Sequence, residues 1–292
     1  MNPALERIKY IIAVILYGTI GTFLRGVSLP SELVAMFRGL IGAAFILIYL
    51  AARRQKLDRA AIRRNGKWLL IGGISLGLNW IFLFAAYMQT TVAIASLCNY
   101  LAPLLVILAA PLALRERLDK RKLPCVAAAF IGIVLVSGVW NASLGNLSGV
   151  VLGVAAALCF AVFVICNRKL KDIPALDKSA VQLAVSAVTI LPYVLARNLG
   201  TALSWDVQSI LIVLMLGVLH TGVAYCLYFS GMGSLPVQTV AILGYLEPVV
   251  SVLCSAFSLR ETMGVSGWIG AVLIIGAAVL SETMPRRPSE PG

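Results

Sequence analysis

The chain has 292 residues, of which 60% are hydrophobic and 12% are charged, and its mean hydropathy is +0.95. Soluble domains carry about 25% charged residues, so this composition excludes an ordinary soluble domain. A net charge of +12 is compatible with nucleic-acid binding, but the basic residues lie between long apolar segments, which argues against a nucleic-acid partner.

Ten apolar segments are long enough to cross a lipid bilayer as helices, because a spanning helix needs about 20 largely apolar residues. The sequence therefore predicts an all-α integral membrane protein with ten transmembrane helices and no segment left over for a soluble domain. The predicted helices lie at residues 8–24, 33–52, 68–87, 92–113, 123–140, 148–167, 179–196, 208–229, 237–258 and 264–282.

Lysine and arginine are distributed unevenly between the connections. Three basic clusters follow the second, fourth and sixth predicted helices, at Arg53–Lys67, Arg115–Lys122 and Arg168–Lys178, and the alternate connections hold at most one arginine each. The positive-inside rule places these clusters and both termini in the cytoplasm, as in a multi-pass protein of the cell (inner) membrane. The first cluster is also a candidate contact for anionic membrane lipids, although setting the topology is its simpler role.

The two halves of the chain carry the same residue pattern. Residues 69–116 recur 145 positions later, so that Tyr100 matches Tyr245 and Pro103 matches Pro248. The predicted repeats, 1–145 and 146–292, hold five helices each, and this odd number inserts the second repeat upside down relative to the first. Two inverted repeats provide two states of similar energy, one open to each side, which is the basis of alternating access in secondary transporters.

Proline interrupts two matching helices near their middle. Pro103 and Pro248 each remove an N–H donor and disfavour helical geometry at the preceding residue, so both helices are predicted to break at the same depth. Glu247 directly precedes Pro248, too deep in its helix to snorkel easily. An ionisable side chain at this depth is a candidate site for substrate or for proton coupling, and the alternative is a structural partner of a buried donor such as His220.

Further candidates lie on the aligned third and eighth helices. His220 is the only histidine and matches Ser75, while Trp80 matches Tyr225. Such residues are often structural, but as the lining of one cavity they suit an amphipathic or aromatic solute. Asn79 and Asn99 are expected to orient the solute or to bond across helices. The remaining candidates are Tyr100 and Tyr245 as aromatic lining and Arg38, which is close enough to its helix end to snorkel, as a contact for a carboxylate.

Two other classes of function remain open at this stage. Gly73–Gly77 reads G-x-S-x-G, the pattern of a serine-hydrolase elbow, but that elbow needs a strand-to-helix turn, and an intramembrane hydrolase would need His220 beside Ser75. A passive channel or lipid scramblase would favour a continuous polar pore, and no ring of charges is visible. All six cysteines lie in apolar segments without a CxxC pair, so neither a metal site nor a cofactor is expected, and no enzyme activity is predicted.

With these features the chain resembles the EamA-type branch of the drug/metabolite transporter superfamily. The resemblance rests on the duplicated architecture, on Glu247-Pro248-Val249-Val250, and on the Leu-Arg-Glu that closes each repeat at 114–116 and 259–261. It implies a carrier that exports an amino acid or another small metabolite through a cavity between the halves. Family members usually carry a small residue where Arg115 and Arg260 stand, so Glu116 and Glu261 are expected to be caps or gates. The substrate, the direction and coupling to protons stay open.

Overall fold

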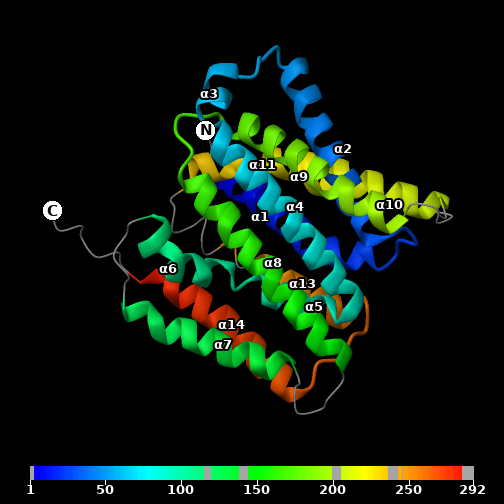
Figure 1. Ribbon diagram of the computed structural model, residues 1–292. Helices are drawn as coiled ribbons and strands as arrows, with labels where there is room; N and C mark the ends of the chain where they lie inside the picture. The colour runs from blue at the N-terminus through cyan, green and yellow to red at the C-terminus, as the bar shows by residue number, and fades with distance from the viewer. Residues whose placement is uncertain are drawn as a thin grey trace.

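The protein is all-helical in the computed structural model, which describes residues 3–114, 120–137, 144–198, 205–235, 243–244 and 246–284, and no strand occurs in these ranges (Figure 1). A π-helical segment, η3 (Val218–Val223), joins α10 to α11, and a short 3-10 turn, η1 (Lys120–Lys122), precedes α7. The α-helices are α1 (Pro3–Leu24), α2 (Ser31–Ala52), α3 (Arg59–Arg64), α4 (Gly66–Gln89), α5 (Val92–Asn99), α6 (Ala102–Ala113), α7 (Leu123–Ser137), α8 (Leu144–Arg168), α9 (Ala175–Asn198), α10 (Val207–Gly217), α11 (Ala224–Ser234), α13 (Leu246–Phe257) and α14 (Val265–Thr283).

Seven helical stretches of the described chain are long and apolar enough to cross a membrane, and three apolar helices, Leu123–Val136, Leu246–Phe257 and Val265–Ser281, are shorter. The sequence predicted ten full-length spans. The fifth and ninth predicted spans extend into residues 138–140 and 237–242, which lie outside the described residues. The short helix α3 was not predicted, because its sequence is basic and has no apolar periodicity.

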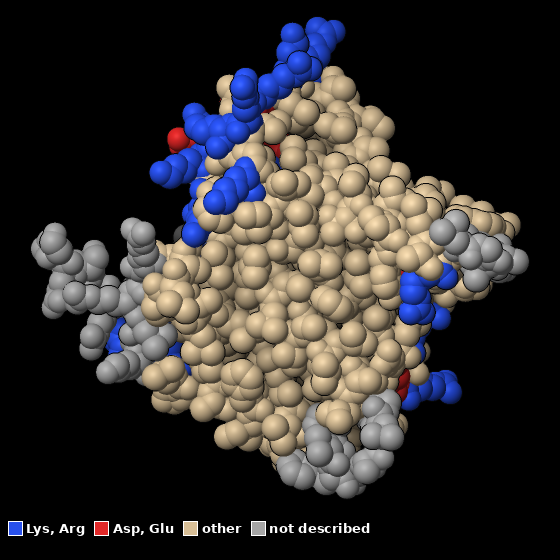
Figure 2. All heavy atoms as spheres, viewed as in Figure 1, with Lys and Arg blue, Asp and Glu red and all other residues tan. Residues whose placement is uncertain are grey.

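The outer surface of the bundle is apolar, as a lipid solvent requires. Large hydrophobic side chains such as Ile48, Val188 and Val272 are 67–69% exposed on three different helices. Figure 2 shows a broad face without charged residues, with lysine and arginine gathered above it over α3 and the end of α2. Exposure of this kind in water would oppose folding, so these faces are suited to contact with lipid.

The helices associate in pairs across the two halves of the chain. The first helix, α1, packs against α11 and α13, while α8, its counterpart in the sequence repeat, packs against α4 and α5. Helices α2 and α9 contact each other, as do α7 and α14, which run side by side along one edge of Figure 1. The interior of the bundle is therefore built from helices of both halves.

Small residues allow the closest helix approach. A Cβ atom added to Gly77 of α4 would lie 2.9 Å from the carbonyl oxygen of Ser186 in α9, and one added to Gly73 would lie 2.5 Å from the Cβ of Val185. These two glycines form the GxxxG pair of the hydrolase-like pattern. Their role in the structure is to bring the backbones of α4 and α9 together.

The fourth predicted helix is broken in two. Helix α5 ends at Asn99, Tyr100 and Leu101 form a turn, and Pro103 lies in the first turn of α6. Pro248 occupies the first turn of α13. Proline is accommodated at these positions because the first N–H groups of a helix have no partner within the helix.

The two ends of the bundle differ in charge. The end that carries the connections 53–65 and 169–174, with α3 between α2 and α4, is called the basic end. There Asn65 ties the two connections together, since its Oδ1 accepts from the Lys171 N–H at 2.9 Å and its Nδ2 donates to the Lys171 carbonyl at 2.8 Å. The opposite end carries Arg25, Asp206 and Glu261.

Candidate functional site

Arg38 of α2 is buried inside the bundle, with 6% of its surface exposed. Its Nε donates to Thr221 Oγ1 at 2.8 Å, and its guanidinium carbon lies 4.4 Å from the centre of the Trp80 ring. Thr221 donates to the Leu216 carbonyl at 2.8 Å, which leaves its oxygen free to accept from Arg38. The position of Arg38 near the end of its predicted helix suggests that its side chain snorkels to the interface, but α2 packs against α4 and η3, and the side chain is buried between them. The cation–π contact with Trp80 and the hydrogen bond to Thr221 replace contacts that the guanidinium would make with water at the membrane surface.

Glu247 lies in the first turn of α13, where α1 and α13 approach each other closely. A Cβ atom added to Gly18 of α1 would lie only 2.6 Å from the Glu247 carbonyl oxygen. The Tyr100 side chain, at the break between α5 and α6, lies close enough to the Glu247 carboxylate to interact with it electrostatically. The break in the fourth helix and the start of α13, which the sequence repeat relates, therefore lie near each other.

Arg38 and Glu247 interact electrostatically with each other and with the hydroxyls of Tyr17, Tyr87 and Tyr225. Within the described residues they form no ion pair, and the terminal guanidinium nitrogens of Arg38 have no hydrogen-bond partner there. Two opposite charges therefore face the same interior region without neutralising each other by contact. We call this set the central cluster; its members are Tyr17, Arg38, Trp80, Tyr87, Tyr100, Tyr225 and Glu247.

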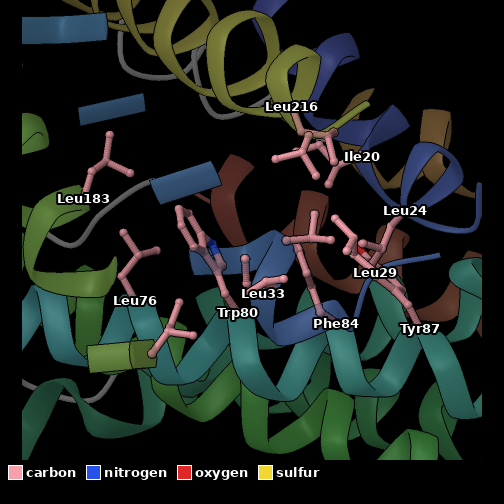
Figure 3. Close-up of a cluster of buried hydrophobic side chains, with 14 of the residues drawn as sticks. Ile20, Leu24, Leu29, Leu33, Leu76, Trp80, Phe84, Tyr87, Leu183 and Leu216 are labelled. Carbon is pink, nitrogen blue, oxygen red and sulfur yellow. The ribbon is translucent and has the colours of Figure 1, made fainter. Parts of the chain in front are cut away.

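Aromatic rings surround these charges from three helices. Figure 3 shows Trp80, Phe84 and Tyr87 projecting from the same side of α4. The Tyr17 ring of α1 lies 6.0 Å from the Tyr225 ring in an edge-to-face arrangement. The Tyr87 hydroxyl is 3.3 Å from Ser96 Oγ, which accepts from Ser251 Oγ at 2.7 Å, so that α4, α5 and α13 are linked.

Sequence reasoning missed Tyr17 and Thr221. Tyr17 was detectable, because it lies seven residues after Tyr10 and both therefore fall on one face of the first helix. Tyr10 and Tyr17 both contact Tyr228, at ring separations of 4.9 Å and 5.9 Å. Thr221 gave no such signal, since its role depends on the π-helical turn that aims it at Arg38, and a π-helix has no pattern in this sequence.

Asn79 and Asn99 are used in bonding between helices. The Nδ2 of Asn79 donates at 2.9 Å both to Asn99 Oδ1 and to the carbonyl of Ala156 in α8. Both amide hydrogens of Asn79 therefore have partners. The structure thus places this pair on the side of α4 that faces α8, where it links α4, α5 and α8.

His220 lies in η3, and its hydrogen bonds and ring contact are made outside the central cluster. Its Nε2 is 3.0 Å from Thr19 Oγ1, its Nδ1 is 3.4 Å from the Met215 carbonyl, and its ring packs edge-on against Phe23. Neither Glu247 nor Ser75 is among these contacts. The alternative pairing of Glu247 with His220, and the pairing of His220 with Ser75 that a hydrolase would need, are therefore absent among the described contacts. Tyr245, the remaining candidate, lies outside the described residues.

A second polar network joins three segments at the end opposite the basic end. Arg25, which follows α1, donates to Glu261 Oε1 at 2.9 Å and to the Thr90 carbonyl at 2.6 Å. The other oxygen of Glu261 accepts from the Val92 N–H at 2.9 Å and from Ser255 Oγ. We call this the Arg25–Glu261 network. It connects the end of α1 to the α4–α5 and α13–α14 connections.

The model of the EamA-like transporter family matches this chain over residues 8–138 and again over 147–283. The chain belongs to the EamA-like transporter family. The resemblance inferred from the duplicated helices is confirmed. As a member of the EamA-like family the protein is a transporter of the membrane and not an enzyme, so the serine-hydrolase alternative is wrong.

Its EamA-like relatives include transporters without an assigned substrate and one with an assigned substrate. The uncharacterized transporter YxxF of Bacillus subtilis (strain 168) is 27% identical over 284 residues, which cover 96% of this chain and 89% of the relative. The aromatic amino acid exporter YddG of Ancylobacter novellus is 27% identical over 222 residues, covering 74% and 75%. A solved crystal structure superposes with a TM-score of 0.68 at 23% identity over 98% of this chain and 100% of the other, which establishes likeness of fold.

Proposed function

We propose that the protein is a secondary carrier that exports a small zwitterionic metabolite with an apolar or aromatic side chain, such as an aromatic amino acid. The observation that carries this proposal is the arrangement of Arg38 and Glu247, which face one aromatic-lined region with opposite charges and form no ion pair with each other. An aromatic amino acid exporter among the relatives supports both the substrate class and the direction.

The chemistry of the central cluster fits an amino acid group by group. The free guanidinium nitrogens of Arg38 suit the substrate carboxylate, because Arg binds carboxylates through a planar pair of donors. The Glu247 carboxylate suits the substrate ammonium, and the nearby Tyr100 hydroxyl interacts with that carboxylate. Trp80, Tyr17 and Tyr225 then provide aromatic surface for the side chain. Trp80 and Thr221 hold Arg38 in place before substrate arrives, which reduces the entropy lost on binding.

The proposed architecture is ten transmembrane helices in two inverted repeats, residues 1–145 and 146–292. Support comes from the two separate matches to the family model and from the reciprocal contacts of α1 and α8. The seven long and three shorter apolar helices of the described chain supply enough elements for ten spans. The basic end, by the positive-inside rule, is the cytoplasmic end, and both termini are then cytoplasmic.

Alternating access requires a gate at each end of such a carrier. The Arg25–Glu261 network joins segments of both repeats at the end that this topology assigns to the outside. We infer that it closes the outer exit in this state and separates when the carrier opens outward. A gate built from a few exposed hydrogen bonds and one ion pair suits a switch, since each contributes only about 1 kcal/mol.

Counterflow into proteoliposomes tests the proposal. Vesicles preloaded with an unlabelled aromatic amino acid are expected to accumulate the labelled form, whereas a passive channel or scramblase would only equilibrate it. Glu247→Gln is expected to lower this flux about 100-fold, because an ammonium would then be desolvated without a charged partner. Glu32→Gln, a buried carboxylate near the outer end of α2, serves as the matched control.

Proton coupling through Glu247 is tested in the same vesicles with and without a pH gradient. If Glu247 carries the proton, wild-type flux depends on the gradient and the residual flux of Glu247→Gln does not. If the vesicles accumulate sugars or nucleosides but no zwitterion, the assigned substrate class would be overturned. The protein would still be a carrier.

A further inference from the structure

A cavity of about 530 Å³ lies at the basic end, apart from the central cluster. It is formed by the end of α2, the start of α9 and the first two turns of α11. The walls combine polar and apolar groups, of which four enter the argument: Lys56, Asp177, Cys226 and Phe229. A volume of this size is in the range of small-molecule pockets, about 300–1,000 Å³. We call it the basic-end pocket.

The pocket carries two opposite charges that do not pair. Asp177 is only 3% exposed, and its Oδ2 accepts from the Asp58 N–H at 2.8 Å. Its Oδ1 has no hydrogen-bond partner in the described part of the chain. Lys56 lines the same pocket, and its ammonium forms no ion pair with any described residue, Asp177 included. The second Asp177 oxygen is therefore available to accept a charge-assisted hydrogen bond from a ligand ammonium in the pocket.

Aromatic rings connect this pocket to the central cluster. Phe229 lines the pocket and lies 5.8 Å from the Tyr225 ring and 5.3 Å from the Tyr228 ring. Tyr225 contacts Tyr17 at 6.0 Å, and both belong to the central cluster. A continuous row of rings therefore runs from the basic end to the region between Arg38 and Glu247.

We propose that the basic-end pocket is a loading site at which the zwitterionic solute binds before it reaches the central cluster. Lys56 binds the carboxylate, Asp177 binds the ammonium, and Phe229 packs against the side chain. The identity of the solute rests on the proposed function. The walls include Gln55, Lys56 and Pro174, which are exposed residues of the connections, so the pocket opens toward water rather than only toward lipid.

Cys226 provides a direct test, because this thiol lines the pocket and is partly exposed. In a variant that retains Cys226 as its single cysteine, aromatic amino acids are expected to slow labelling by a membrane-impermeant maleimide added at the basic end. Lys56→Gln and Asp177→Asn are each expected to raise about ten-fold the amino acid concentration that halves the rate of Cys226 labelling. This is the effect of losing one charge-assisted contact. Lys171→Gln and Asp172→Asn, on the adjacent connection but outside the pocket, are the matched controls.

Phe229→Leu extends the test to the side chain of the solute. This variant is expected to reduce protection by aromatic amino acids and to leave protection by aliphatic ones unchanged. Because Lys56 is exposed, Lys56→Gln remains informative even if Asp177→Asn loses the Asp58 contact and folds poorly.

The outcomes separate the loading site from the proposed function. Transport of zwitterions without protection of Cys226 would overturn the loading site alone. Protection in Glu247→Gln, whose transport is lost, would support a site separate from the central cluster. If phosphatidylethanolamine in the vesicles protects Cys226 from labelling when no amino acid is present, the loading site would be overturned. The pocket would then be a site for a lipid head group. Protection of Cys226 without transport of any zwitterion would keep the pocket's assignment and overturn the proposed function.

Discussion

Two charged regions of this bundle use arginine and glutamate in opposite ways. In the Arg25–Glu261 network the two side chains touch at 2.9 Å, and the second Glu261 oxygen accepts from the Val92 N–H and from Ser255 Oγ. In the central cluster Arg38 and Glu247 interact across a distance and leave hydrogen-bonding groups unused. A satisfied pair holds segments together, whereas a separated pair leaves capacity for a third group. The comparison indicates a gate at one place and a binding site at the other.

The largest expected effect on transport is at Arg38, which with Glu247 forms the separated pair. Arg38→Gln should lower counterflow of aromatic amino acids about 100-fold, because the carboxylate loses its charged partner in a buried site. Flux of an arylamine that lacks the carboxylate should change little. The thermal midpoint in detergent should stay the same or rise, because the variant removes a desolvated charge. Equal losses for the acid and the amine would show that Arg38 only supports the structure.

A steric change at the same site comes next. Gly18→Ala should lower the free energy of unfolding by about 1–3 kcal/mol, since the new methyl group would meet the Glu247 carbonyl at 2.6 Å and force α1 and α13 apart. Gly276→Ala is the matched control, because nothing lies within 4 Å of a Cβ atom there. Thermal unfolding in detergent measures both. A neutral Gly18→Ala would contradict the close approach of the two helices.

Removing the ion pair between Arg25 and Glu261 should give a smaller effect. Arg25→Gln and Glu261→Gln are expected to make a cysteine placed at position 91 more accessible to a membrane-impermeant reagent from the outside. A double-mutant cycle for this partly exposed pair should give a coupling energy of about 1 kcal/mol. Strict additivity of the two variants would argue against a gate formed by this ion pair.

The smallest effect is expected at Asp206, next to α10 at the same end. Ser28 and Ser209 donate hydrogen bonds to its carboxylate, and they lower its pKa from 3.8 to about 2. A lowered folded-state pKa contributes stability that is present above about pH 4 and lost as the pH falls toward 2. Below about pH 4 the wild type should therefore lose more thermal stability than Asp206→Asn. Parallel pH curves for the two proteins would contradict this assignment.

Much of the fold follows from residues that are visible in the sequence. Apolar runs predict most helices to within a few residues, and Pro103 predicts the interruption that the structure has at Tyr100 and Leu101. The last residues of the fifth predicted span and the first of the ninth, 138–140 and 237–242, lie outside the described residues, so these two lengths stay predictions. The basic helix α3 had no apolar face to predict it.

The candidate site was only partly predictable. Glu247 and Trp80 were selected for their depth and chemistry, and both belong to the central cluster. Asn79 and His220 have the same apparent depth, yet the structure turns them toward Ala156 and Thr19. Sequence position gives the depth of a side chain in the membrane, whereas its direction depends on which neighbouring helix covers it.

The sequence by itself determined the solvent, the family and the depth of each charged residue, because hydropathy and repeat spacing are properties of the chain alone. Only the tertiary structure decided that Arg38 points inward onto Trp80 and that Arg25 meets Glu261. It also decided that Lys56 and Asp177 line one pocket without pairing. These are relations between segments far apart in sequence, and they depend on how α1, α2, α9 and α13 pack, which no local pattern specifies.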